Sequence, residues 1–518
     1  MKNNLPNSRH AWRLLAALTT LLCACGGQDH DAAPGQSPPL PASASQPAAG
    51  IDRPFVDERS YSNRGDAALN DASEAAAVVH RQIMVGGRTL PYTATTGHLS
   101  ATDRDTGKRA SMFYVAYSVD NIDPVRRPVT FLFNGGPVTA SVWLHLGSWG
   151  PKRISTETRA ADGSSYPLID SSDSLLDQTD LVFVDAVGSG YSQAIAPSVN
   201  RDFWGVDADA TVFRDFISRY VAVNGRGASP IYLYGESYGG IRAGVLADLL
   251  ETAGIKVSGV VLNSPILNFN TACDLGAPDC TGFVPTYAAV STYHRVSNKP
   301  EAMSPADYIE QARRFSIDAY RPALRASIDL GTAPSIALLS ALNGYTGLAS
   351  SLWANHLNLT PDIYSVNVKP GYVVDINDGR LATPAGGDWS DPYSDAFESH
   401  IRTLLPGFLG YRSGSTYSMA AGDSWQWTHD GLPLPDAIPD LASALTQNPD
   451  MKILALNGYH DLNCPFFQTD LELARIGKMS QVRSYTFAGG HMTYLTEASP
   501  EPLRQALRDF YGHPGAGS

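Results

Sequence analysis

The sequence is poor in cysteine, in basic residues and in long apolar runs. It has five cysteines in 518 residues, and 38 lysines and arginines stand against 51 aspartates and glutamates. An acidic chain without a basic cluster lacks the positive surface that nucleic acids and anionic membranes attract, so no nucleic-acid partner is expected. The cysteines lack the paired spacing of zinc ligands, and no metal or other cofactor is predicted. No segment repeats at a fixed period.

The first 25 residues are typical of a signal peptide. Lys2, Arg9 and Arg13 precede the apolar run "LLAALTTLLCA", which is too short to span a bilayer. The run ends in "LCAC", which resembles a bacterial lipobox and implies lipidation of Cys25. The expected location is the bacterial periplasm or outer membrane, with membrane contact only through the lipid anchor. Ordinary signal cleavage nearby is the alternative. The Gly/Pro/Ala/Ser tract that follows predicts a low-complexity tether over residues 26–74.

Export would place the remaining cysteines in an oxidising compartment. Cys273 and Cys280 flank the short loop "DLGAPD". This spacing favours a disulfide, and two separate thiols are the alternative.

The main body of the chain reads as an α/β fold. Alternating residues from 75 to 117, broken by "GG" and "DTG", predict antiparallel hairpins. From residue 128 onward, short continuous apolar runs predict strands buried on both faces of a mostly parallel sheet. These runs are "VTFLF" (129–133), "DLVFVD" (180–185), "PIYLYG" (230–235), "VSGVVLN" (257–263), "KILALN" (452–457) and "VRSYTF" (482–487). Helical patterns before and after the run at 230 indicate helices on both faces.

The alternation of strands and helices is lost between residues 267 and 430. We interpret this stretch as a cap inserted over the sheet. The α/β core is then made of two parts, residues 75–266 and residues 431–518.

Ser237 is the candidate nucleophile. It lies between Gly235 and Gly239 in "YGESYGG". A lone G-x-S-x-G is weak, but here it follows an apolar strand and opens an amphipathic helix, as a nucleophile elbow requires. The alternative is a surface serine in a glycine-rich turn.

The serine needs a base and an acid that orients the base. Groups at the carboxyl ends of parallel strands gather at one edge of a sheet. Asp461 follows the strand at 452 and His491 follows the strand at 482. The order Ser237, Asp461, His491 is that of the α/β-hydrolase fold. His460 and His294 are rivals for the base, but the first adjoins Asp461 on the same loop and the second lies in the predicted cap.

The oxyanion formed by serine attack needs N–H donors. We expect one from Tyr238, the residue after the nucleophile, and one from Gly136 in the "NGGP" loop that follows the strand at 129. Tyr191, Trp425 and Trp427 are candidates for a side-chain pocket, although such aromatic residues are more often simply core.

Taken together, the motifs resemble those of the serine carboxypeptidase family, in its bacterial branch. They are "FNGGP", "SVWLHLGSWGPKRI", "DLVFVDAVGSGYS", "GESYGG", "NGYHDLNCPF" and "GGHM". The resemblance runs from about residue 78 to about residue 511. It implies metal-free removal of C-terminal residues from peptides through an acyl-enzyme, with Asn134 and Glu236 binding the substrate's terminal carboxylate.

The chain departs from the family pattern at two places. Val138 stands where the family usually has a glycine, and a β-branched residue disfavours positive φ. Ser148 and Trp149 stand where many members carry a further acid. The departures keep two alternatives open: an esterase or acyltransferase with the same triad, and a surface lipoprotein that only binds.

Glu236 is an unexpected neighbour for a nucleophile, because its charge would repel an oxyanion. Successive side chains leave an elbow in different directions, so the carboxyl need not face the reacting atoms. A carboxyl that shares a proton with a substrate carboxylate would bind it. This reasoning favours an exopeptidase and predicts that peptide binding weakens as pH rises.

Overall fold

The computed structural model describes residues 50–156, 166–273, 279–387, 393–422, 424–495 and 500–512. The predicted signal peptide, Cys25 and the first part of the predicted tether lie outside these residues. In the described part of the chain, no helix combines the length and the apolar character needed to cross a membrane.

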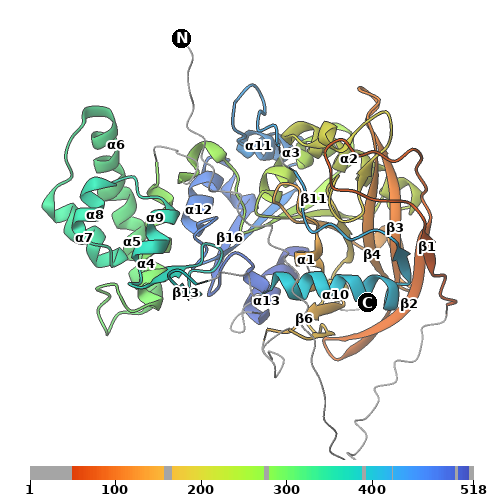
Figure 1. The fold of residues 1–518 in the computed structure, drawn as a ribbon, viewed down its shortest axis with the longest axis horizontal. Coiled ribbons are helices and arrows are strands. Elements are labelled where there is room, and N and C mark those ends of the chain that lie inside the picture. Colours follow the sequence, from red (N-terminus) through yellow and green to blue (C-terminus); the bar gives the residue numbers. More distant parts are fainter. Residues whose placement is uncertain are drawn as a thin grey trace, which may run out of the picture. The chain divides into compact units, whose positions relative to one another are not determined.

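A twisted, mostly parallel sheet forms the centre of the fold (Figure 1). The five strands β16, β15, β11, β10 and β5 run parallel, as does β8 beside β5, whereas β4, β3 and β2 continue the sheet as antiparallel hairpins. In spatial order the strands are β16 (Val482–Phe487), β15 (Lys452–Gly458), β11 (Val257–Asn263), β10 (Ile231–Glu236), β5 (Val129–Phe133), β8 (Asp180–Val184), β4 (Arg109–Val119), β3 (Arg88–Thr102) and β2 (Ala76–Val85), with β9 (Gln193–Ala194) paired to β4. All six apolar runs noted in the sequence are strands of this sheet, and the hairpin prediction for residues 75–117 is confirmed.

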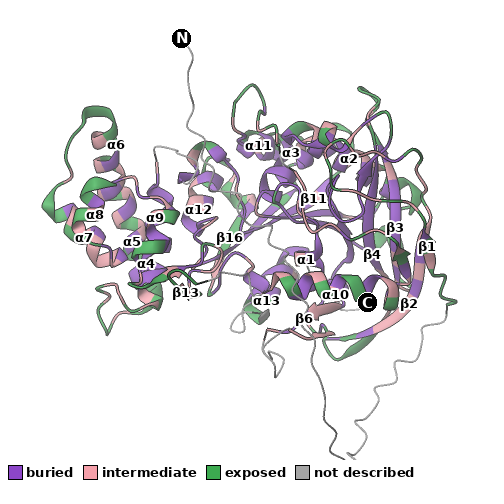
Figure 2. Cartoon of the chain, viewed as in Figure 1, coloured by how far each residue is buried: buried purple, intermediate pink, exposed green. Residues whose placement is uncertain are grey.

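Helices cover both faces of the sheet, as predicted. One layer packs on the face that contains Phe131 and Phe133, and the other on the face that contains Leu132. The two layers appear above and below the sheet in Figure 1. The first consists of α2 (Val206–Val223), α3 (Gly239–Thr252) and α11 (Ile438–Gln447), and the second of α1 (Val142–Gly147), α10 (Ser394–Gly407) and α13 (Pro500–Tyr511). Burial on both faces explains why β5, β8 and β10 are continuously apolar, and Figure 2 shows these central strands as buried.

A helical cap follows β11. It has its own apolar core, which includes Tyr287, Trp353 and Tyr364. Its helices are α4 (Val284–Tyr293), α5 (Pro305–Phe315), the π-helical turn η7 (Ser316–Tyr320), α6 (Arg321–Leu330), α7 (Ile336–Thr346), α8 (Ser350–Asn355) and α9 (Pro361–Asn367), followed by the hairpin β12 (Tyr372–Val374) and β13 (Ala382–Pro384). α12 (Phe466–Ala474) belongs to the second part of the core and lies between β15 and β16 in the chain.

The predicted cap boundary at 430 is wrong. α10 contributes Phe397 and Leu405 to the core beneath the sheet, and β14 (Tyr411–Ser413) pairs with β1 (Phe55–Asp57). The predicted tether boundary at 74 is also wrong. β1 and the buried Asp57 lie before it and belong to the folded body. The segment near residue 60 has few apolar residues, so the sequence pattern did not reveal it. Polar contacts hold it in place, since Asp57 accepts hydrogen bonds from the hydroxyls of Tyr61 and Tyr411.

The remaining elements are short. β6 (Lys152–Ile154) pairs with β7 (Leu168–Asp170). Single 3-10 turns are η1 (Pro124–Arg126), η2 (Leu175–Asp177), η3 (Asn200–Phe203), η4 (Phe269–Thr271), η6 (Thr281–Phe283), η8 (Met479–Gln481) and η9 (Thr493–Leu495).

Candidate active site

Ser237 occupies a sharp turn between β10 and α3. Its φ is +61°, a left-handed conformation that costs a non-glycine residue roughly 1–3 kcal/mol. A Cβ on Gly235 would collide with the carbonyl oxygen of Gly239, so the turn closes only because position 235 lacks a side chain. The N–H groups of Gly240 and Ile266 donate to the Ser237 carbonyl at 2.8 and 3.1 Å. The strand–turn–helix predicted for a nucleophile elbow is therefore present.

Asp461 and His491 form a buried pair beyond the ends of β15 and β16. His491 Nδ1 lies 2.9 Å from Asp461 Oδ2. The other carboxylate oxygen accepts the N–H groups of Asn463 and Cys464 at 3.0 and 2.9 Å. Burial acts to lower the pKa of His491, but the neighbouring Asp461 carboxylate and Cys464 sulfur outweigh it and raise that pKa well above its ordinary value. The carboxylate thus orients the ring and stabilises its charged form.

The parallel sheet brings Ser237, Asp461 and His491 to the same edge, because each follows the carboxyl end of a strand. Among the described residues, no hydrogen bond joins the Ser237 hydroxyl to His491. Such contacts are commonly loose without substrate, and the role of His491 as the base for Ser237 stays a prediction. The rivals lie elsewhere: His294 Nε2 binds the Gly379 carbonyl at 2.7 Å, and Nδ1 of His460 is buried without a partner among the described residues.

The predicted oxyanion loop lies directly against the elbow. A Cβ on Gly135 would lie 2.5 Å from the Tyr238 nitrogen, so only a glycine permits this approach. Gly136 has a φ of +106° and makes the turn. Val138 is not among the described residues with positive φ, so the β-branched side chain causes no strain there. The loop therefore accommodates this departure from the family pattern, and Gly136 and Tyr238 remain the proposed oxyanion donors.

Arg242 holds the oxyanion loop and was not identified from the sequence. Its guanidinium donates to the carbonyls of Asn134 and Pro137 at 2.6 and 2.7 Å and pairs with Asp209 at 2.6 Å. The side chain is buried, on α3 one turn after the nucleophile. The signal was present as an arginine inside an otherwise apolar helix, which is rare without a buried partner.

Glu236 is 3% exposed and lies between two amides. Asn134 Nδ2 donates to Oε1 at 2.7 Å, and Asn263 Nδ2 donates to Oε2 at 3.1 Å. Burial raises the pKa of Glu236 to about 7, although the charge of His491 and the hydrogen bonds from Tyr494 and Asn263 act against the rise. The predicted neighbours Asn134 and Glu236 are in contact, and Asn263 is an additional member of the group that the sequence did not single out.

The other predicted residues have mixed outcomes. Cys273 and Cys280 form a disulfide. Tyr191 belongs to the core, where its hydroxyl binds the Ser415 carbonyl and its ring packs on Phe113. Trp425 and Trp427 are half-buried and pack against Tyr238, the residue after the nucleophile, with ring centroids 5.4 and 6.1 Å away.

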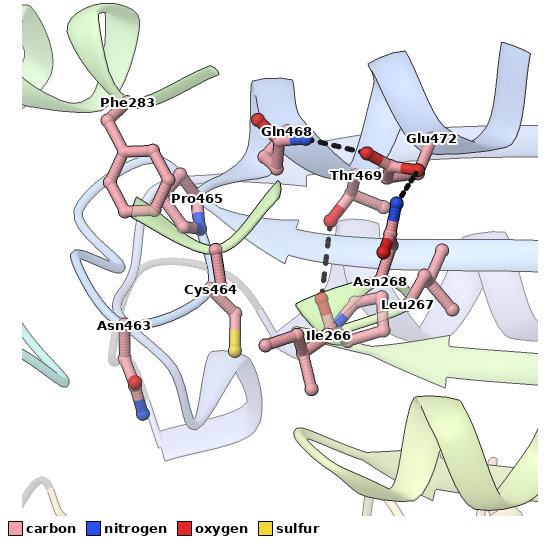
Figure 3. Close-up of a pocket in the computed structure, with 12 residues that line it drawn as sticks. Ile266, Leu267, Asn268, Phe283, Asn463, Cys464, Pro465, Gln468, Thr469 and Glu472 are labelled. Atoms are coloured by element: carbon pink, nitrogen blue, oxygen red, sulfur yellow. Dashed lines mark hydrogen bonds between the residues drawn. The ribbon is translucent and has the colours of Figure 1, made fainter. Parts of the chain in front are cut away.

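A small pocket lies between the segment after β11, the cap and α12 (Figure 3). Two lining residues connect the pocket to the site. The Ile266 N–H donates to the Ser237 carbonyl, and the Cys464 N–H donates to the Asp461 carboxylate. Its acid, Glu472, is hydrogen-bonded to Gln468 and Asn268 and ion-paired with Arg475. The acid is therefore already neutralised, and the pocket offers apolar surface more than charge.

Within the described part of the chain, two groups contain residue types that bind metals. One is the cluster Asp461, Cys464 and His491, whose contacts are those of an acid–base pair. The other is the cluster His429, Asp430 and Asp440. His429 uses both ring nitrogens to bind Asp207 and Asp440, and these bonds raise its pKa to about 10. This is the behaviour of an imidazolium held by two carboxylates.

The strand order of the sheet, with a nucleophile elbow after β10, an acid after β15 and a histidine after β16, defines a hydrolase of the α/β-hydrolase type. The family model described as serine carboxypeptidase matches residues 86–278. This match confirms the resemblance seen in the motifs over residues 86–278. No curated protein matches the chain.

Solved structures match the chain at low similarity. A proline iminopeptidase from Mycobacterium smegmatis is 14% identical, covers 80% of this chain and 97% of its own, and has a TM-score of 0.34. An esterase from Thermogutta terrifontis is 15% identical with the same coverage and a TM-score of 0.33. The haloalkane dehalogenase DbeA from Bradyrhizobium elkani is 14% identical, covers 81% and 97%, and has a TM-score of 0.31. Similarity at this level carries no argument about activity.

Proposed function

We propose that the protein is a serine carboxypeptidase that releases C-terminal residues from peptides. Ser237 attacks the scissile carbonyl while His491 takes its proton and then gives it to the leaving amine. Asp461 orients the ring and stabilises its charge. Water then hydrolyses the acyl-enzyme by the same proton transfers in reverse order. These steps use side chains and backbone groups alone.

The oxyanion is proposed to bind the N–H groups of Gly136 and Tyr238. Arg242 supports this arrangement because it fixes the two carbonyls on either side of Gly135 and Gly136. A preorganised donor pair of this kind is commonly worth a hundredfold or more in rate, about 3 kcal/mol.

One observation carries the choice of substrate: Glu236 is a buried carboxyl with its pKa raised to about 7, directly before the nucleophile. Asn134 and Asn263 hold both of its oxygens. A protonated carboxyl can donate to a substrate carboxylate, whereas an ionised one would repel it. An esterase has no need for such a group, because the leaving part of a simple ester carries no carboxylate.

Tyr494 is a second supporting feature. Its hydroxyl is buried and interacts with Glu236 and Asn134. Burial raises the pKa of Tyr494 well above its ordinary value, and the charge of nearby Glu236 adds to the rise. The hydroxyl therefore belongs to the same group of side chains as Glu236 and Asn134. Many family members carry an acid where this chain has Ser148. We propose that the Tyr494 hydroxyl takes the role of that acid and binds the substrate carboxylate.

The test is a C-terminal ladder. A mixture of peptides is incubated with the protein and followed by mass spectrometry, beside the same peptides with amidated C-termini and beside Ser237→Ala. We expect stepwise loss from the free C-terminus, much slower loss from the amides, and none with the variant. Turnover of small esters with no cleavage of any free peptide would instead support the esterase or acyltransferase alternative. No covalent labelling of Ser237 by a fluorophosphonate would support a protein that only binds.

A further inference from the structure

A short cap segment touches the loops of both predicted catalytic partners of Ser237. We call residues 375–380, between β12 and β13, the cap strap. The His491 N–H donates to the Asn377 carbonyl at 2.6 Å. The Leu462 N–H donates to the Ile376 carbonyl at 3.0 Å, and the Gly379 N–H donates to the His460 carbonyl at 2.8 Å. These three bonds hold His491 itself and both neighbours of Asp461.

Side chains tighten the same contact. Asn463 Nδ2 donates to Asn377 Oδ1 at 3.2 Å, and the Asn463 N–H donates to the Asp461 carboxylate at 3.0 Å. Gly490 lies so close to the strap that a Cβ there would collide with the Asn377 carbonyl oxygen and lie 2.7 Å from Asp378 Cβ. There is no free space in which the residue before His491 could move toward the cap.

The strap is rigid for reasons of its own. Asp375 Oδ1 accepts the N–H groups of Asn377 and Asp378 at 2.9 and 2.6 Å, which fixes the turn. Arg380 forms a two-pronged pair with Asp378 at 2.8 and 2.5 Å. The cap anchors the strap from behind, since His294, at the end of α4, binds the Gly379 carbonyl at 2.7 Å.

We propose that the cap strap is a positioning device for the catalytic base, with Asp375 as its main positioning residue. A general base must be held within about half an ångström of its productive position. His491 lies on a loop beyond the end of the edge strand β16, which has a neighbour on one side only, and a loop is a poor scaffold by itself. The strap adds to the support given by Ser264, whose hydroxyl donates to the His491 carbonyl at 2.7 Å, so the cap shapes the proton transfer. The inference rests on the triad of the proposed function and is independent of whether the substrate is a peptide or an ester.

The experiment compares Asp375→Ala, which removes the acceptor of the turn, with Asp375→Asn, which keeps it. Asp329→Ala is a matched control, an exposed carboxylate on α6 of the same cap. Each full-length variant is assayed for the rate of fluorophosphonate labelling, for kcat and KM on an activated ester and a blocked dipeptide, for the pH profile of kcat, and for Tm.

We expect Asp375→Ala to lower kcat and the labelling rate about tenfold or more, as a misplaced base does, with KM changed less than about twofold. The pKa of the base read from the kcat profile should fall, because a displaced ring loses its contact with Asp461. Asp375→Asn and Asp329→Ala should match the wild type. Arg380 is partly exposed, and Arg380→Ala removes only its pair with Asp378. This variant should show a smaller loss of the same kind, and it provides the test if Asp375→Ala does not fold.

Three results separate the possibilities. Wild-type labelling and kcat in both Asp375→Ala and Arg380→Ala would overturn the proposal. A loss of activity that follows the loss of Tm, without a change in the pH profile, would show that the strap is only structural and would also overturn it. A wild type that is not labelled at all would remove the triad and the proposed function with it.

Discussion

Glu236 keeps its proton near neutral pH because burial removes the water that would stabilise its charge. The sequence raised the question of this carboxyl, and its position before Ser237 was enough to predict an unusual role. Its second amide partner, Asn263, could not be foreseen, because the partner comes from the end of the neighbouring strand β11 and the distance along the chain gives no sign of the contact.

The proton on Glu236 should control peptide binding. Because the pKa is about 7, the binding-competent form dominates at about pH 6 and declines above about pH 7. KM for a blocked dipeptide should therefore rise by up to about tenfold per pH unit above the pKa, while kcat changes less. Glu236→Gln, which is neutral at every pH, should give a flat KM profile between about pH 6 and about pH 8.

A small ester without a carboxylate is the control for that experiment, since its KM should not follow the Glu236 proton even in the wild type. If Glu236→Gln kept the wild-type KM profile for the peptide, Glu236 would not be the group that senses pH.

Tyr494 should matter for peptides and not for esters. Tyr494→Phe removes one donor aimed at a charged group, a contact commonly worth about 1.5–3 kcal/mol, so KM for a peptide should rise by about tenfold to a hundredfold. The value of kcat/KM for a small ester should stay within about twofold of the wild type. Tyr511→Phe, which removes another buried hydroxyl, bonded to Thr130, is the matched control. An equal loss on esters and peptides would show that the tyrosine acts on packing alone.

At the scale of elements, Asp185 joins three segments at the end of β8. Its carboxyl accepts the Ser141 N–H at 2.7 Å, just after the oxyanion loop, and the Tyr417 hydroxyl at 2.8 Å. Burial raises the pKa of Asp185 to about 7. The folded protein thus binds a proton that the unfolded chain releases near pH 4.

The sign of the effect on stability follows from this difference. Between about pH 4 and about pH 7 the folded state holds the extra proton, so the free energy of unfolding falls as pH rises, by a few kcal/mol at most. Asp185→Asn should remove most of this slope: Tm of the wild type should drop between about pH 5 and about pH 8 more than Tm of the variant. Parallel Tm profiles for the two proteins would contradict the assignment.

The elements that the sequence predicted best are those whose burial leaves a pattern. The six apolar runs became strands, and the glycines around Ser237 became an elbow, because each depends on local residues. β1 and the cap strap were missed because backbone and carboxylate hydrogen bonds to distant segments hold them. Such contacts leave no periodicity in the sequence.

At the scale of the whole molecule, β11 and β15 are neighbours in the sheet although residues 264–451 lie between them in the chain, so the site is complete only when these strands have paired. Chain order was enough to find Asp461 and His491, because an open parallel sheet forces strand ends to one edge. The same rule could not say how the cap meets that edge, since the cap helices pack around Tyr287 and Trp353 in a core of their own.

The last prediction concerns where the molecule is held. If Cys25 carries lipid, that lipid would attach the folded body to a membrane through the predicted tether. Two acyl chains give stable anchoring, at about 0.8 kcal/mol for each buried methylene. In a bacterial host the wild type should therefore sediment with membranes and incorporate labelled palmitate. Cys25→Ala should not incorporate palmitate, and it should be either uncleaved at residue 25 or cleaved nearby. It should keep full activity once it is released by detergent or recovered in the soluble fraction. Equal palmitate labelling of both proteins would place the anchor elsewhere, and no labelling of the wild type would favour ordinary signal cleavage.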